Sequence, residues 1–120
     1  MSEARDLAVK EVLADLEAAY PGSVAALVLR SGALFAGRAP AAVNREVYAA
    51  MVAAMEGASE TATADLGDEV QSVEARLKGG ALFCAPVGRK LVLVLFAPGP
   101  AAAKGPSGVV AAASRVTPLF

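Results

Sequence analysis

Side chains that could carry out acid–base or nucleophilic chemistry are sparse in this sequence. The chain has no histidine, which removes Ser-His and Cys-His nucleophile pairs and imidazole metal ligands. Its single cysteine, Cys84, lies in an apolar run that predicts a strand. A buried thiol without a positive neighbour is unreactive, so Cys84 is interpreted as a small core residue. We therefore expect no catalytic residue and no enzymatic activity.

Two short segments have some of the features of ligand loops. Asp65, Asp68 and Glu69 could meet around a hard cation, but they lack the alternating spacing and closing glutamate of a calcium loop. The stretch Lys104-Gly105-Pro106-Ser107 lacks the spacing of a phosphate loop, and Pro106 has no amide to offer. The sequence thus predicts no metal site and no cofactor.

The charge balance gives no sign of a polyanionic partner. The chain carries 11 basic and 12 acidic side chains, a net charge of −1. Lys78, Arg89 and Lys90 stand at predicted strand ends without interleaved aromatic residues, so we expect no nucleic-acid binding. The longest uncharged run, Leu91–Ala103, is interrupted by prolines and shorter than the roughly 20 residues of a spanning helix. We expect no membrane insertion and a cytoplasmic location.

The N-terminal part predicts a helix followed by a hairpin. Apolar residues recur at helical spacing at Val9, Val12, Leu13, Leu16 and Tyr20. Pro21-Gly22 ends this helix, and apolar runs at Val24–Arg30 and Ala33–Arg38 predict two strands. Ser31-Gly32 between them is typical of a two-residue hairpin turn, because glycine supplies the positive φ that such turns need.

A second helix is predicted from Arg45 to about Ala64, with Asn44 as its N-cap. The stripe expected to be buried consists of Val47, Met51, Ala54, Met55, Ala58 and Ala62. Tyr48, Val52 and Glu56 form a neighbouring stripe at i, i+4 spacing. This second stripe fits equally well the margin of a helix lying on a sheet or an exposed surface that meets a partner.

The C-terminal half predicts three strands and a helix. Ser72, Glu74 and Arg76 alternate with apolar residues in Val70–Leu77, which favours a strand with one polar face, often at a sheet edge. That face either meets solvent or lies where the strand pairs with a second copy of itself. Two further strands, Ala81–Val87 and Lys90–Phe96, and a helix from Ser107 as N-cap to about Val116 complete the order.

This order resembles the roadblock/LC7 family over nearly the whole chain, and residues 1–120 are interpreted as a single domain. The resemblance rests on Pro21-Gly22 through Ser31-Gly32-Ala33-Leu34, on Met51 and Met55 with their alanines, and on Lys90–Phe96. It departs from the family at Ser31, where an acidic residue or asparagine is usual, and in the Gly-Pro-Ser-Gly stretch ahead of the last helix. The branch that it resembles is the bacterial and archaeal one of small-GTPase regulators.

The resemblance implies an α+β sandwich of the profilin-like class, with a five-stranded antiparallel sheet in the order 2-1-5-4-3. It also implies a homodimer joined through the third strand, with Ser72, Glu74 and Arg76 at the seam, and a small Ras-like GTPase as partner. The stripe Tyr48, Val52 and Glu56 is the candidate surface for that partner. The expected function is a non-enzymatic regulator or scaffold that modulates the nucleotide cycle or localisation of the GTPase. The alternative is a small-ligand sensor with a pocket between the sheet and a helix.

Overall fold

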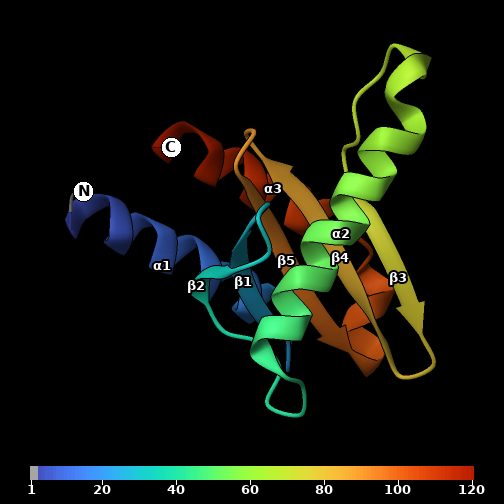
Figure 1. Ribbon diagram of the computed structural model, residues 1–120. Coiled ribbons are helices and arrows are strands. Elements are labelled where there is room, and N and C mark those ends of the chain that lie inside the picture. Colours follow the sequence, from blue (N-terminus) through green and yellow to red (C-terminus); the bar gives the residue numbers. More distant parts are fainter. Residues whose placement is uncertain (1–2) are drawn as a thin grey trace.

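The computed structural model describes residues 3–120 and shows an antiparallel five-stranded sheet with helices on both faces (Figure 1). The helices are α1 (Glu3–Ala19), α2 (Arg45–Thr63) and α3 (Ser107–Val116). The strands are β1 (Val24–Leu29), β2 (Leu34–Gly37), β3 (Val73–Leu77), β4 (Gly80–Val87) and β5 (Leu91–Pro98). Short 3-10 helices, η1 (Ala64–Leu66), η2 (Gly99–Lys104) and η3 (Thr117–Leu119), follow α2, β5 and α3. The strand order is β2-β1-β5-β4-β3, which confirms the fold class and the predicted element order.

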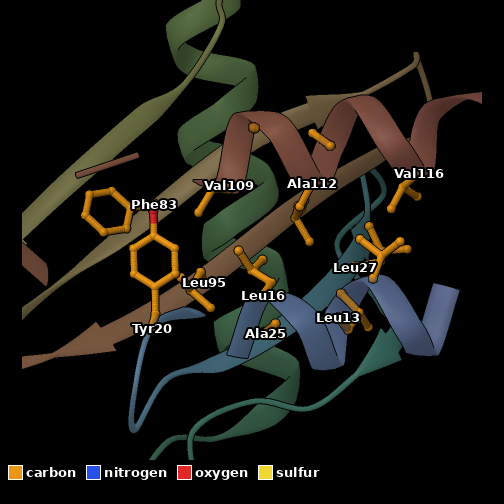
Figure 2. Packing of buried hydrophobic residues seen from close by; sticks show 14 of the residues in the cluster. Leu13, Leu16, Tyr20, Ala25, Leu27, Phe83, Leu95, Val109, Ala112 and Val116 are labelled. Carbon is orange, nitrogen blue, oxygen red and sulfur yellow. The ribbon is translucent and has the colours of Figure 1, made fainter. Parts of the chain in front are cut away.

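The sheet divides the core into two layers because successive side chains of a strand point to opposite faces. On one face, α1 and α3 pack side by side over Leu93 and Leu95 of the central strand (Figures 1 and 2). On the other face, α2 packs alone over Val92 and Val94. This explains why β5 is apolar on both sides.

The first hairpin differs from the predicted two-residue turn. The amide of Leu29 donates to the carbonyl of Ala33 at 2.7 Å, and the amide of Gly32 donates to the carbonyl of Leu29 at 2.8 Å. The loop therefore spans Arg30, Ser31 and Gly32, and Gly32 has φ +101°. A type I turn followed by a positive-φ residue is the usual three-residue hairpin loop, so glycine is still needed, one position later in the loop than predicted.

The third strand is shorter than predicted and begins at Val73 instead of Val70. Its pairing with β4 runs from Leu77 opposite Gly80 to Val73 opposite Cys84. Continuing this register would place Gln71 opposite Pro86, which has no N–H to contribute to a ladder. The proline thus accounts for the lost strand residues.

The last helix lies where the sequence predicts it, but its N-cap position is occupied by Pro106 and Ser107 is already helical. Tyr20 fixes this segment to the end of α1: its hydroxyl donates to the carbonyl of Gly105 at 2.6 Å and accepts from the amide of Gly108 at 3.1 Å. A Cβ at position 108 would come within 2.8 Å of the Tyr20 ring, so the close approach needs glycine there. None of the helices in residues 3–120 has the length and apolar character needed to cross a bilayer.

Replacing Tyr20 with phenylalanine is expected to lower the free energy of unfolding by about 1–3 kcal/mol, because Gly105 and Gly108 lose a partner that water cannot easily replace. Tyr48→Phe is the matched control, since the Tyr48 hydroxyl is buried without a hydrogen-bond partner. We expect the control to be neutral or stabilising in urea unfolding. Equal losses in the two variants would show that the Tyr20 hydroxyl does not secure α3.

Candidate interaction face

The orientation of α2 on the sheet is the reverse of the prediction. Tyr48, Val52 and Glu56 are 9%, 1% and 0% exposed and face the sheet. Val47 and Met51, which were predicted to be buried, are 58% and 56% exposed. The expectation of an exposed Tyr48–Val52–Glu56 stripe is therefore wrong, and these side chains present no surface to a partner while α2 is seated.

The physical reason is that α2 is apolar around most of its circumference, so its periodicity allows either orientation. Glu56 adds to this ambiguity, because a carboxylate ordinarily marks the solvent side of a helix. Here Ala49 and Val52 fit closely against the sheet and are fully buried, and Glu56 is buried with them.

The exposed side of α2 carries a continuous run of apolar side chains. We call it the outer face of α2; it comprises Val47, Met51, Ala54, Ala58 and Ala62. Beyond the helix, Leu66 in η1 extends the run and is 74% exposed. An apolar stripe of this length on a surface is typical of an interaction site. The same residues were recognised in the sequence as one stripe but were assigned to the core.

Next to this face, β3 forms a free edge of the sheet (Figure 1). Its ladder with β4 is regular along all of Val73–Leu77. The opposite edge strand, β2, is only four residues long, and its register with β1 shifts between Leu27 and Val28. Short, irregular edges resist pairing with another chain, whereas a regular edge is a template for it.

The predicted seam residues lie at this edge. Glu74 and Arg76 form an ion pair at 2.5 Å, and the Arg76 guanidinium donates to the carbonyl of Ala102 at 3.2 Å and stacks 5.9 Å above the Phe83 ring centre. Their side chains therefore lie on the α1–α3 side of the sheet. Ser72 is half-buried and directly precedes β3.

Under α2, buried polar groups gather against the sheet. Burial, reinforced by nearby Glu60, raises the pKa of Glu56 to about 7, although Arg30 acts to lower it. Neither Glu56 carboxyl oxygen has a hydrogen-bond partner. Burial, with the negative charge of Glu56, also raises the pKa of the Cys84 thiol well above its usual range, so this thiol is protonated at neutral pH. Its lack of a thiolate form fits the interpretation of Cys84 as a core residue.

The segments that resembled ligand loops adopt other arrangements. Asp68 accepts a hydrogen bond from the amide of Glu69, and no cluster of metal-ligating side chains occurs in residues 3–120. Lys104 bonds the carbonyl of Ala19 and lies over the Tyr20 ring, so it fastens η2 to α1. An open depression of about 620 Å³ lies between the C-terminal half of α2 and the β4–β5 turn, and Arg30, Glu60 and Arg89 line it.

The space between α2 and the sheet, where the ligand-sensor alternative requires a pocket, is filled by side chains. Val28, Val52 and Val94 are each at most 1% exposed and pack together there. The open depression described above is charged and lies outside this layer. These observations give the sensor alternative no support.

The sheet order and the placement of helices define the molecule as an α+β sandwich with a regular free edge beside an apolar helix face. The chain belongs to the Roadblock/LC7 domain family, whose sequence model matches residues 9–97. Among curated proteins, no sequence matches the chain closely enough to count as a relative.

Solved structures of the same fold include bacterial MglB and MglC proteins. The gliding protein MglB of Thermus thermophilus superposes with a TM-score of 0.83 at 21% identity, covering 99% of this chain and 93% of that one. Myxococcus xanthus MglB gives 0.80 at 18% identity, with coverages of 100% and 92%. MglC of the same bacterium gives 0.64 at 14% identity, with coverages of 94% and 99%. At these identities, the similarity establishes the fold.

Proposed function

We propose that this chain is a non-enzymatic, dimeric regulator of a small Ras-like GTPase in the cytoplasm, acting as a single Roadblock/LC7 domain. The observation that carries the proposal is the outer face of α2 beside the regular β3 edge, on a chain of the Roadblock/LC7 family. The resemblance to this family implies the small Ras-like GTPase as partner. One solved MglB structure of this fold is described as having a tetrameric arrangement, which supports self-association of this chain.

Self-association uses the β3 edge. Two copies pair their third strands in antiparallel fashion across a two-fold axis, and the two sheets become continuous. A pairing centred on Ala75 places Glu74 opposite Arg76 of the second copy, and opposite charges facing across strands stabilise a sheet. Ser72 lies at the end of this seam.

The outer face of α2 serves both the dimer and the partner. Ala54, Ala58 and Ala62 have short side chains, so this part of the helix allows close approach of the second copy's α2. Val47 and Met51 are larger and more exposed, and methionine adapts to irregular apolar surfaces. We assign these two residues to contact with the GTPase, in place of the buried stripe Tyr48, Val52 and Glu56.

The test is a calorimetric titration against the small Ras-like GTPases of the same genome, each loaded with GDP or a non-hydrolysable GTP analogue. We expect one GTPase to bind in one nucleotide state at least about tenfold more tightly than in the other, a difference of about 1.4 kcal/mol. Met51→Glu should weaken this binding by about tenfold or more, because it places a charge in an apolar contact.

Leu7→Glu is the matched control, since Leu7 is 59% exposed on α1, against 56% for Met51 on α2. It should leave the affinity unchanged. Absence of binding by every GTPase in both nucleotide states would refute the proposed partner. Equal weakening by both variants would refute the assignment of the contact to Met51.

A further inference from the structure

Glu56 is an unusual residue on the inner side of α2. Its side chain is fully buried at 0% exposure, within the layer formed by α2 and the sheet, and both carboxyl oxygens lack a hydrogen-bond partner. Val52 one turn earlier and Cys84 on β4 are buried in the same layer. An ionised carboxylate in such a layer is strongly disfavoured unless it is paired.

The ionisable groups around Glu56 come from three elements. Glu60 follows one turn later on α2, Arg30 lies at the end of β1, and Cys84 faces α2 from β4. β2 and β5 contribute no ionisable side chain to this layer. On β3, Glu74 and Arg76 pair with each other on the opposite side of the sheet. Arg30 is therefore the one positive group within reach of Glu56 among the described elements that pack against α2.

The guanidinium of Arg30 has partners at some of its nitrogen atoms but not at all of them. Its guanidinium forms an ion pair with Glu60 and donates to the carbonyl of Gly88 at 3.2 Å. Its Nε is buried and has no hydrogen-bond partner. The Nε–H group can thus donate a hydrogen bond to a second carboxylate. The Glu56 side chain has to move out of the apolar layer to reach it.

We propose that the Glu56 carboxyl makes the seating of α2 depend on pH. Protonated, the carboxyl stays in the apolar layer and α2 lies close against the sheet. When it ionises, it releases its proton to solvent and turns toward Arg30 and the edge of the layer. This movement loosens the C-terminal half of α2, whose other side is the outer face.

The direction of the effect follows from linkage. The pKa of Glu56 is raised from 4.5 to about 7 in the folded chain, so the folded state holds this proton more tightly than the unfolded state. The contribution of Glu56 to stability is therefore highest below pH 4.5, falls as the pH rises toward about 7, and is constant above that. Near neutral pH, the folded chain therefore contains Glu56 in both its protonated and its ionised form.

The experiment compares urea unfolding of the wild type and Glu56→Gln between pH 4.5 and 8. Relative to the variant, the unfolding equilibrium of the wild type should shift toward the unfolded state by about 140-fold over this interval, as follows from a pKa that rises from 4.5 in the unfolded chain to about 7 in the folded one. Hydrogen exchange of the α2 amides, corrected for intrinsic rates, should be faster at pH 8 in the wild type alone. Glu11→Gln, at an exposed position of α1 on the other face of the sheet, is the control and should retain the wild-type pH dependence.

Parallel pH profiles of the wild type and Glu56→Gln would overturn the proposal. A second measurement does not require a variant: the carbon-13 chemical shift of the Glu56 carboxyl in the wild type should titrate near pH 7, and titration below pH 5 would also overturn it. The pH dependence of α2 does not rest on the proposed function. Only its consequence for partner binding at the outer face of α2 does. Because these measurements use the protein without a partner, a failure to bind any GTPase leaves their outcome unaffected.

Discussion

Val52→Asp is expected to leave the chain largely unfolded, with a loss of more than about 4 kcal/mol in the free energy of unfolding. Val52 is 1% exposed and packs among Val28, Cys84 and Val94 under α2. A carboxylate at this position loses its hydration, and the described residues that form this buried cluster include no basic side chain. The measurement is urea unfolding followed by far-ultraviolet circular dichroism.

Val47→Asp is the matched control, because it makes the same chemical change in the same helix. Val47 is 58% exposed, so its replacement should alter the free energy of unfolding by no more than about 0.5 kcal/mol. If Val47→Asp unfolded the chain and Val52→Asp did not, α2 would be seated on the face that the sequence pattern favoured. The orientation of the interaction face would then be wrong.

Ala58→Glu is expected to raise the dissociation constant of the dimer at least about 100-fold, or about 2.7 kcal/mol, while the monomer remains folded. Ala58 lies in the small-residue part of the outer face of α2, and it is exposed. In the proposed dimer, a two-fold axis brings this position of both copies close together, so the substitution adds two long side chains and two like charges to one contact. Sedimentation equilibrium over a concentration series measures the change.

The control for this variant is Ala111→Glu, an identical substitution at an exposed position of α3 on the other side of the sheet. It should leave self-association unchanged. A dimer that tolerates Ala58→Glu, or that weakens equally with Ala111→Glu, would contradict the assignment of the α2 outer face to the seam.

Much of the fold could be predicted because local patterns and tertiary packing agree. The helical spacing from Val9 to Tyr20 marks residues that are all buried, and the side chain of Asn44 caps α2 by accepting from the amide of Val47. The two-sided apolar pattern of Leu91–Phe96 indicated a central strand, and β5 lies in the middle of the sheet. These signals depend on residues close together in the chain.

The features that sequence patterns did not predict depend on contacts that the chain makes at long range. The rotation of α2 is decided by how Ala49 and Val52 fit the sheet, and a helix rich in alanine carries little information about this. The start of β3 depends on Pro86, which stands on another strand. The buried state of Glu56 is not visible in the sequence pattern, because a carboxyl group can enter an apolar layer in its protonated form and nothing local in the chain marks this.

The proposed regulator depends on the outer face of α2 and the β3 edge forming one interface between two copies of the chain. Light scattering of the wild-type protein at micromolar concentration tests this most directly, because the mass of one chain is 12.0 kDa. We predict a mass twice this value, which falls to that of one chain in Ala58→Glu. A folded wild-type protein with the mass of a single chain would contradict the proposed interface.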